Sequence, residues 1–493
     1  MAYKHGVYTQ EVPTSIVPAV NTTAGLPVVF GTAPVHLASD RAPINKPVLC
    51  YSYSEAVAQF GFSKDFAKYT LCEVMYSQFA LYNRAPVVFV NVLDLKTHKK
   101  TVSDKEVTLT DKIGKLEAAV LLETLKVKKA SAGQPLSAGT DYEAAYDDDG
   151  VLVITALEGG EAESAASLFL DYDELDASMV DADDIIGGVS VSDGSVKGLE
   201  VLNKVFPAVN LVPGIVLAPG WSENPTVAAV MKAKAGNINS HFKAITLNDV
   251  PSDAVKKYTD VKAWMNQNSY NDASQVVCWP LVKLGDTVYH MSTHVLGVMA
   301  QVDSANDDIP YESPSNKSMQ INGCCLKDGT EVQLGPDEGE YLNGQGVVTA
   351  LNFIGGWKCW GNRTACYPSN TDPKDAFICI RRMFNWHAQT FIQTYWAKVD
   401  KPINKRLIQT IVDSENMRLN GLTGQGVILG GRIEFREDEN PTTNLMDGII
   451  KFHTYLTPPA PVLRRLLRRV KSKTCLNMIQ RILKRCSANW EVR

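Results

Sequence analysis

The chain has 493 residues, of which 45% are hydrophobic and 21% are charged, and its formal net charge at pH 7 is −5. These values are ordinary for a soluble globular protein of two to four domains. No apolar run is long enough to span a membrane and the N-terminus lacks the apolar core of a signal peptide, so we expect a protein that is made and kept in the cytoplasm.

The first 95 residues divide into an arm and the start of a folded domain. In residues 1–24, Pro13 and Pro18 stand among β-forming residues without a helical period, which predicts an extended N-terminal arm. Residues 25–95 are expected to be the first part of a core domain. Its expected elements are strands at Pro27–Gly31 and Val87–Val92, the second apolar on both faces, and helices at Tyr53–Phe60 and Tyr69–Tyr82.

Residues 96–196 interrupt this pattern and predict an inserted, β-rich, acidic outer domain. Residues 130–196 hold sixteen Asp or Glu and no Lys or Arg, which indicates a surface that faces solvent. A hairpin is expected where Asp149-Gly150 separates two strands, because Asp-Gly supplies the positive φ angles of a two-residue turn. The run Asp147–Asp149 lacks the spacing of a calcium loop, so we interpret it as a solvated turn.

Residues 197–370 return to an alternation of strands and helices, which predicts right-handed crossovers and a parallel sheet. The expected elements are strands at Gly214–Ala218, Phe242–Leu247 and Gln275–Trp279 and helices that begin at Asn224-Pro225 and near Val255. Residues 301–370 are rich in loops. We therefore expect a mixed α/β core domain in two parts, 25–95 and 197–370, with the β-rich domain inserted between them.

Residues 371–461 are expected to form a C-terminal domain that opens with two helices, 376–398 and 402–420. Apolar residues at helical spacing in the first helix predict a core stripe of Phe377, Ile380, Phe384, Ala388, Phe391 and Tyr395. Strands are expected at Val427–Leu429, Arg432–Arg436 and Gly448–Leu456. Residues 462–493 are a basic tail with ten Lys or Arg and one Glu, whose apolar residues fit an amphipathic helix.

Motifs for catalysis or cofactor binding are not found in the sequence. There is no phosphate-binding loop of the G-x-x-x-x-G-K-[ST] type, and none of the ten cysteines stands in a CxxC pair. His290 and His294 are four residues apart, but Met291 occupies the position where a zinc protease needs Glu. Ser292–Gly297 is similar to the histidine motif of subtilisin-like proteases, yet no nucleophile motif follows it. We expect no catalytic residue, cofactor or metal, and a capping or core role for His294.

Two motifs in the C-terminal half are the most specific in the chain. Gly355–Thr364 reads GGWKCWGNRT, and Phe377–Arg382 follows as a segment that can be interpreted as a strand running into Arg381-Arg382. The helical stripe over the same residues predicts a helix instead. The residues that characterise the two motifs are Trp360, Gly361, Arg363, Thr364, Arg381 and Arg382. Together they resemble the C-terminal half of contractile tail sheath proteins, which coat the tails of phages and contractile bacteriocins.

Further blocks extend this resemblance over most of residues 6–461 outside the insertion. They are Gly6–Tyr8, Thr23–Ala33 and His294–Lys317, in the order in which the family carries them. The resemblance implies a non-enzymatic subunit that polymerises helically around a tail tube and contracts with energy stored at assembly. It also implies extended arms that add strands to the sheets of neighbouring subunits.

Site residues and partners follow from the same resemblance. Subunit interfaces are expected at Gly6, Val7, Tyr8 and Val12 in the N-terminal arm and at Ile450, Phe452 and Tyr455 in the strand before the tail. Lys405 and Arg406 are the candidates for contact with the tube. The expected partners are identical subunits, the tail tube protein, and baseplate and tail terminator proteins, without direct contact to nucleic acid.

The chain departs from the family after Pro461, where the family would continue with an acidic strand. Cys475–Leu483 can be encoded by codons that, read one base earlier, give the sheath-like peptide L-L-E-Y-D-P-T-Y-L, so we interpret residues 462–493 as a frame-shifted C-terminal arm. Two other functions stay open. One is a degenerate subtilisin-like hydrolase that uses His294, and the other is a binder of nucleic acid or membranes that uses the basic tail.

Overall fold

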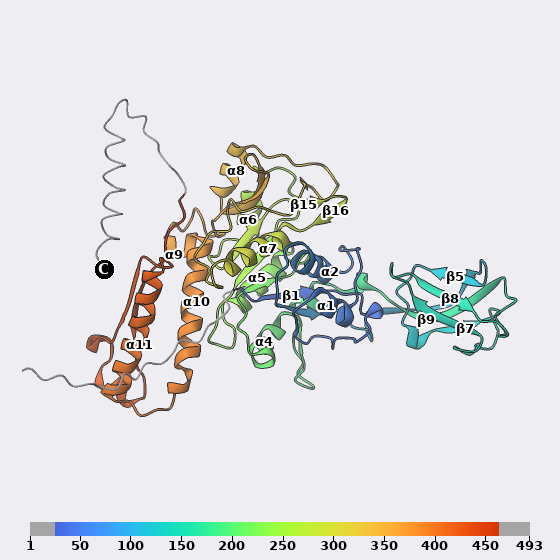
Figure 1. Ribbon diagram of the computed structural model, residues 1–493, viewed down its shortest axis with the longest axis horizontal. Helices are drawn as coiled ribbons and strands as arrows, with labels where there is room; N and C mark the ends of the chain where they lie inside the picture. The colour runs from blue at the N-terminus through green and yellow to red at the C-terminus, as the bar shows by residue number, and fades with distance from the viewer. Residues whose placement is uncertain (1–24, 463–493) are drawn as a thin grey trace, which may run out of the picture. The chain divides into compact units, whose positions relative to one another are not determined.

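The structure is a computed structural model that describes residues 25–462; residues 1–24 and 463–493 lie outside the described part (Figure 1). Its central element is an eight-stranded sheet in the order β19-β18-β14-β13-β12-β1-β3-β2. The six strands from β18 to β3 are parallel, and an antiparallel strand is added at each edge. The strands are β1 (Pro27–Gly31), β2 (Val48–Cys50), β3 (Val87–Asn91), β12 (Ile215–Leu217), β13 (Ile245–Asp249), β14 (Gln275–Cys278), β18 (Val347–Asn352) and β19 (Trp357–Trp360).

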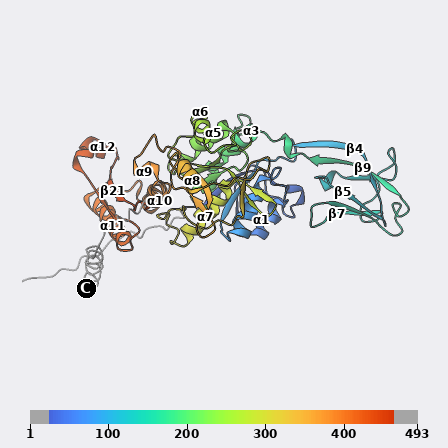
Figure 2. The same ribbon diagram turned by 90° about the horizontal axis from the view of Figure 1, so that it is seen from above.

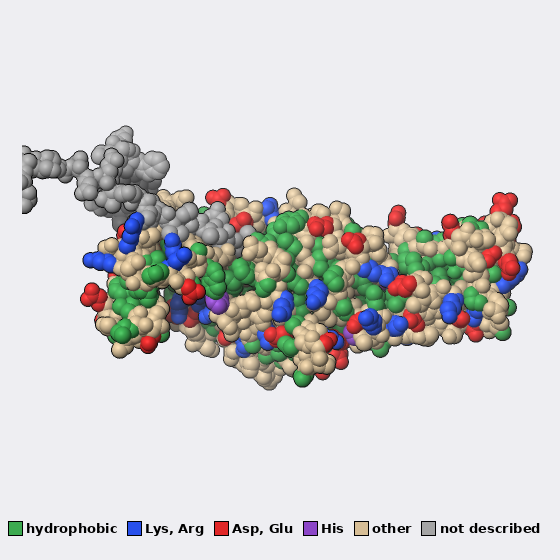
Figure 3. Space-filling model, turned by 90° about the horizontal axis from the view of Figure 1, so that it is seen from below, with side chains coloured by type: hydrophobic (Ala, Val, Ile, Leu, Met, Phe, Trp, Pro, Cys, Tyr) green, Lys and Arg blue, Asp and Glu red, His purple; other side chains and the backbone are tan. Residues whose placement is uncertain are grey.

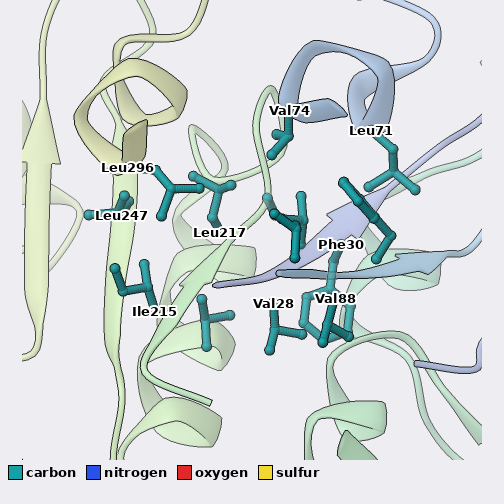
Figure 4. Close-up of a cluster of buried hydrophobic side chains, with 14 of the residues drawn as sticks. Val28, Phe30, Leu71, Val74, Val88, Ile215, Leu217, Leu247 and Leu296 are labelled. Carbon is teal, nitrogen blue, oxygen red and sulfur yellow. The ribbon is translucent and has the colours of Figure 1, made fainter. Parts of the chain in front are cut away.

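Every residue of β1, β3, β12 and β13 is buried, and β1, β3 and β12 are accordingly almost entirely apolar, whereas β13 carries the buried polar residues Thr246, Asn248 and Asp249. Figure 4 shows Leu71, Val74 and Leu296 from the covering helices on the same side of the strands as Leu217, with Val28 on the opposite side. The predicted parallel sheet and mixed α/β class are thus confirmed.

Most of the helices expected for the core domain are present, but the helix expected near Val255 begins only at Val261. Tyr53–Phe60 is helical as predicted, and the helix expected at Tyr69–Tyr82 continues as a π-helix from Tyr76 to Leu81. Asn224 caps the next expected helix by accepting a hydrogen bond from the Thr226 N–H, with Pro225 at the first helical position. The helices are α1 (Tyr53–Phe60), α2 (Thr70–Met75), α3 (Ala182–Ile186), α4 (Leu202–Val209), α5 (Pro225–Ala235), α6 (Val261–Gln267), α7 (Met291–Ser304) and α8 (Pro336–Asn343). We call the main sheet and these helices the body.

The inserted segment forms two three-stranded antiparallel sheets around a core of its own (Figure 2). One sheet holds β4 (Lys99–Thr108), β9 (Ser167–Leu175) and β6 (Lys126–Lys128), and the other β5 (Ile113–Leu116), β8 (Leu152–Ala156) and β7 (Tyr142–Tyr146). Val180 and Ile185, which the sequence placed in the insertion, contribute to the core of the body. The domain boundaries otherwise remain predictions.

The predicted hairpin is present between β7 and β8, but its turn differs from the prediction. The Asp147 N–H donates to Val151 O and the Gly150 N–H donates to Asp147 O, which makes a three-residue turn. Gly150 has a φ of +78°, whereas Asp149 keeps a negative φ. The Asp147 carboxylate accepts hydrogen bonds from the Asp149 and Val151 N–H groups and so stabilises the longer turn.

The expected C-terminal domain contains α9 (Pro373–Ala376), α10 (Ile378–Tyr395), α11 (Lys405–Gly424), β20 (Gly430–Glu434), α12 (Thr442–Met446) and β21 (His453–Thr457). We call residues 378–457 the C-terminal lobe. The interpretation of Phe377–Arg382 as a strand was wrong, because the chain is helical from Ile378. Val427–Leu429 is not a strand either, and β21 begins at His453 rather than at Gly448. Small sheets formed by β10 (Gly188–Val189) with β11 (Val196–Lys197) and by β15 (Leu281–Leu284), β16 (Thr287–Tyr289) and β17 (Gly323–Cys325) complete the described strands.

The apolar stripe predicted for α10 marks its buried face only in part. Phe377, Ile380 and Tyr395 are buried, but Phe384 and Phe391 are half-buried and Ala388 is exposed. The true buried face carries polar residues such as Arg382, His387 and Gln389 beside Met383 and Trp386, so the apolar period alone pointed to a neighbouring face.

Candidate functional site

Three sequence blocks that are far apart in the chain meet at one buried ion pair. Arg382 in α10 and Asp303 in α7 are 3% exposed each, and the guanidinium binds the carboxylate with two hydrogen bonds, one of 3.0 Å from Nη1 to Oδ1. A Cβ on Gly25 would lie 2.8 Å from Asp303 Oδ2, so only glycine fits above this pair. The two-pronged contact joins the start of the described chain, the end of α7 and the start of α10.

The Trp-Gly-Asn-Arg-Thr block joins β19 to the start of α10. The Arg363 guanidinium lies between two aromatic rings, 4.3 Å from the centre of Tyr367 and 3.8 Å from that of Phe377. Thr364 donates from its hydroxyl to Asp375 O at 2.6 Å, and the Asp375 carboxylate accepts from Arg381 Nη1 at 3.1 Å. These contacts of Arg363, Thr364 and Arg381 therefore hold the segment after β19 against the start of α10.

Trp360 and Gly361 fix the position of α8 on the sheet. A Cβ on Gly339 in α8 would lie 3.1 Å from Trp360 Cδ1, so the helix approaches the indole ring closely. Gly361 has a φ of +144°, and a Cβ there would lie 2.9 Å from Val348 Cα. No side chain is accommodated at this point, which explains the glycine after the tryptophan.

A buried polar network holds α10 and α11 together in the C-terminal lobe. Arg418 donates to the Glu415 carboxylate at 2.6 Å from Nη2, and the same Nη2 lies 2.7 Å from His387 Nδ1. Burial, followed by the charge of Arg418, lowers the pKa of His387 to about 4. Glu415 is 1% exposed, so its pairing with Arg418 is needed to keep the charge there.

The two-stranded sheet of the lobe has one covered edge and one open edge. The Ile433 N–H donates to Asn416 Oδ1 and Ile433 O accepts from Asn416 Nδ2, each at 2.9 Å, so a side chain of α11 covers the outer edge of β20. Ile433 faces Thr454 across the ladder. Because Ile433 bonds outward, this pair is not hydrogen-bonded, and the N–H and C=O of Thr454, like those of Leu456, point away from β20. Within residues 25–462 no strand pairs with that side of β21.

Of the predicted C-terminal interface residues, only Tyr455 lies in a strand. Its ring is 37% exposed, and the Arg432 guanidinium lies 4.1 Å from the ring centre. Ile450 and Phe452 precede β21, because the side chain of Asn440 binds both the N–H and the C=O of Lys451 and removes that residue from the ladder. Phe452 instead contacts the rings of Phe391 and Phe435, at 6.4 and 6.3 Å between centroids.

The remaining predicted site residues are placed as follows. Lys405 and Arg406 are exposed at the start of α11 and form no ion pair with any described residue. Gly6, Val7, Tyr8 and Val12 lie outside the described residues, as does the basic tail from residue 463. On the face shown in Figure 3, basic and acidic side chains are interspersed rather than gathered by sign.

His294 is a core residue, as expected from the sequence. It is fully buried in α7, Tyr82 Oη lies 2.9 Å from its Nδ1, and its ring lies edge-on to Tyr82 and Tyr289. Burial lowers the pKa of His294 to about 3. An acyl-transfer histidine needs a carboxylate on one nitrogen and a nucleophile at the other, and Tyr82 occupies the position of the carboxylate.

A cluster of carboxylates and hydroxyls surrounds the start of α7, where buried N–H groups need partners. The His290 N–H donates to Glu73 Oε1 at 2.6 Å, and the Ser292 N–H donates to Asp249 Oδ1 at 3.0 Å. Burial opposes a charge on His290, but the Glu73 carboxylate outweighs it and raises the pKa of the imidazole to about 10. Burial also raises the pKa of Asp249 to about 6. The cluster is accounted for as the cap of a buried helix, a role that the sequence did not reveal.

Residues 25–462 offer neither a membrane-spanning helix nor a cluster of metal ligands. None of the helices there is both long and apolar enough to cross a bilayer. The same residues contain no group of three or more His, Cys, Asp or Glu side chains placed to hold a metal ion.

Comparison with known proteins gives consistent relatives, although no protein-family model matches the chain. The tail sheath protein of Burkholderia phage BcepMu is 28% identical over 477 residues, which are 94% of this chain and 95% of the relative. The tail sheath protein of Escherichia phage P2 is 24% identical over 300 residues, 59% of this chain and 72% of the relative.

Solved structures show the same fold along nearly the whole chain. The sheath of an extracellular contractile injection system in the contracted state, PVC, has 14% sequence identity and a TM-score of 0.54, and the match covers 96% of this chain and 98% of that one. The contracted helical sheath of the anti-feeding prophage has 13% identity and a TM-score of 0.55, with 95% and 99% covered. The chain is therefore a homologue of phage tail sheath proteins with the fold of contractile sheaths, and it is a structural subunit of a contractile sheath.

Proposed function

We propose that this subunit polymerises by accepting a strand from a neighbouring copy at the open edge of β21. The support for this is that Thr454 and Leu456 direct their backbone N–H and C=O groups away from β20, while Asn416 covers the other edge of the sheet. An isolated two-stranded sheet is marginally stable, so added strands stabilise it. The added strand comes from the N-terminal arm, residues 6–12, or from the C-terminal arm of a neighbour.

The polymer is helical, since a contact between two different surfaces of identical subunits builds an open helix wherever its rotation does not close into a ring. It surrounds a tail tube, toward which Lys405 and Arg406 present positive charges without partners among the described residues. Subunits are made and assembled in the bacterial cytoplasm, the polymer ends at baseplate and terminator proteins, and contraction drives the tube through the target envelope. The energy is stored in the lattice at assembly, and the subunit catalyses no reaction.

A proline at position 454 tests strand addition directly. The Thr454 N–H lies outside the β20–β21 ladder, so Thr454→Pro removes a donor needed by an incoming strand and leaves the hairpin bonds in place. We expect a folded subunit with an unchanged melting temperature that forms no striated tubes in negative-stain electron microscopy. Thr454→Ala is the matched control, and it should form tubes.

The tube contact is tested by reversing both charges. Lys405→Glu with Arg406→Glu is expected to leave the melting temperature unchanged and to weaken the copurification of a tail tube with the sheath in a salt-dependent way. If the Thr454→Pro variant forms sheath polymers as readily as the Thr454→Ala variant, strand addition at β21 is refuted. If the reversed-charge variant still binds the tail tube, only the proposed tube contact is refuted.

The frame-shift interpretation of residues 462–493 is settled by the coding sequence. Codons for Cys475–Leu483 that are incompatible with L-L-E-Y-D-P-T-Y-L in the second frame exclude it. If the basic tail is the translated product, strand donation by this arm is impaired, and we expect few or no tubes from the unmodified chain.

A further inference from the structure

An apolar groove of about 430 Å³ lies between the end of α4, the turn at 238–242 and the end of α10. Its walls include Phe206, Pro207, His241, Phe242, Ile392 and Trp396. The volume is within the range of roughly 300–1,000 Å³ of pockets that hold small ligands. The groove is therefore large enough for side chains that are not among those described.

The aromatic walls of the groove are partly uncovered. Trp396 is 57% exposed, and its ring lies edge-on to His241 at 5.1 Å between centroids. Phe206 and Phe242 are in contact behind them, also at 5.1 Å. Large exposed aromatic side chains at the rim of an apolar hollow mark a surface that another segment covers.

The path of α10 connects this groove to the point where the described chain begins. Near the start of the helix, Arg382 lies under Gly25, and further along Gln389 Nε2 donates to Lys243 O at 2.7 Å. Trp396 then follows directly after α10. From Arg382 to Trp396 there are fourteen residues, or about 21 Å along a helix.

The length of chain before Gly25 determines which residues reach the groove. An extended chain covers about 3.3 Å per residue, so six or seven residues before Gly25 span the roughly 21 Å along α10. Ala19 and Pro18 stand at that distance, and Val17 and Ile16, eight and nine residues before Gly25, reach the same point with a chain that is not fully extended. All four are in the segment 15–20, Ser-Ile-Val-Pro-Ala-Val. No Asp, Glu, Lys or Arg occurs between Pro13 and Leu26, so this segment matches the apolar walls in character.

We propose that the groove receives Ile16 and Val17 of the same chain. The N-terminal segment then lies along α10 from Gly25 to Trp396, and the residues before position 16 are the ones left to reach a neighbouring subunit. This contact is within one chain, so it does not depend on strand addition between subunits. Its test can therefore fail or succeed independently of the proposed polymerisation.

Chemical cross-linking between two introduced cysteines tests the proposal on the full chain. Gln393 lines the groove, so Ile16→Cys with Gln393→Cys is joined by a short bismaleimide. All eight described cysteines are buried, and Cys475→Ser with Cys486→Ser removes the remaining two thiols. We expect a cross-linked peptide pair in chains that migrate at monomer mass. The matched control pairs Ile16→Cys with Glu340→Cys, an exposed position on α8, and should give at least fivefold less product.

Two further measurements keep the result decisive. Trp396→Ala in the cross-linking pair removes one wall of the groove and is expected to lower the yield several-fold, whereas a yield that does not change overturns the proposal. Mixing chains that carry only Ile16→Cys with chains that carry only Gln393→Cys should give no product of twice the mass. A cross-linked product of twice the mass would mean that the groove receives this segment from a second copy. If no combination gives a cross-linked product, the segment 15–20 does not occupy the groove. Both outcomes overturn the proposal.

Discussion

The body and the C-terminal lobe differ in whether the outer backbone edge of their last strand is hydrogen-bonded. In the body, the edge strand β19 is hydrogen-bonded on its outer side by a loop, since Cys359 donates to Lys317 O and Met319 donates to Trp357 O. In the lobe, β21 has no strand on its outer side among the described residues. An uncovered edge is a general risk for unwanted pairing. The body thus protects its β19 edge, whereas the lobe leaves the outer edge of β21 open, which is the edge at which we propose that a neighbouring strand is added.

The largest effect is expected from the buried ion pair that joins the lobe to the body, between Arg382 of α10 and Asp303 of α7. Arg382→Ala leaves the Asp303 carboxylate buried without a partner and should cost about 3–5 kcal/mol of unfolding free energy. Arg381→Ala is the matched control, because its pair with Asp375 is more exposed and contributes about 1 kcal/mol or less. Urea denaturation of both variants checks this, and equal losses would contradict the central role of Arg382.

Opposite responses to pH are expected next. The pKa of His387 is lowered to about 4 in the folded lobe, below its unfolded value of 6.5. Its neutral imidazole therefore contributes fully to the free energy of unfolding above pH 6.5, and this contribution is lost as the pH falls toward 4. The loss is on the order of 3 kcal/mol. The pKa of His290 in the body is raised to about 10, so its contribution is complete below pH 6.5 and is lost as pH rises through 10.

Region-resolved hydrogen exchange, corrected for its intrinsic pH dependence, measures this difference. At pH 4.5 the lobe should lose protection before the body, and His387→Gln should remove most of that acid sensitivity. If the variant and the unmodified protein lose protection in the lobe at the same pH, His387 is not the responsible group.

Two helical glycines give a smaller contrast. A Cβ on Gly297 in α7 would lie 2.2 Å from Tyr82 Cδ2, so Gly297→Ala should destabilise the body by about 1–3 kcal/mol. A Cβ on Gly421 in α11 meets nothing within 4 Å, so Gly421→Ala should stabilise the lobe by about 0.5–1 kcal/mol. Thermal unfolding of the two variants should therefore shift in opposite directions, and a common direction would show that the two helices are packed alike.

The smallest effect is expected on the exposed side of the lobe. Arg432 lies over the Tyr455 ring, and Arg432→Ala should cost about 0.5–1 kcal/mol, because the contact is open to water. Arg432→Lys keeps a cation near the ring and should lose less. Urea denaturation distinguishes the two, and an equal loss would mean that the guanidinium plane, not its charge, makes the contact.

The elements that the sequence predicted well are those with local causes. β1 and β3 are continuous apolar runs because both of their faces are covered. The first helix starts where the Ser52 hydroxyl accepts from the Glu55 N–H, a cap that is visible in the sequence. By contrast, α7 was missed because it is buried on nearly every side, so its residues show no amphipathic period.

The parts of the site that escaped prediction depend on contacts between distant residues. The partner of Arg382 is 79 residues away in the chain, and nothing in the local pattern pairs it with Asp303. Asn416, which covers the outer edge of β20, is an ordinary polar residue of a helix in the sequence. β18 and β19 were taken as loop because short apolar stretches among glycines do not reveal that they complete a sheet.

The position of β1 has a mechanical consequence. The chain enters the body at Gly25 and continues at once into β1, which is paired with β12 on one side and β3 on the other. A force that pulls on the chain end along the strand axis loads both ladders together in shear, so many hydrogen bonds have to yield at the same time. An outermost strand pulled from its end would peel away one bond after another. Attachment through an interior strand thus makes the folded subunit a firm anchor for whatever tension its first residues carry.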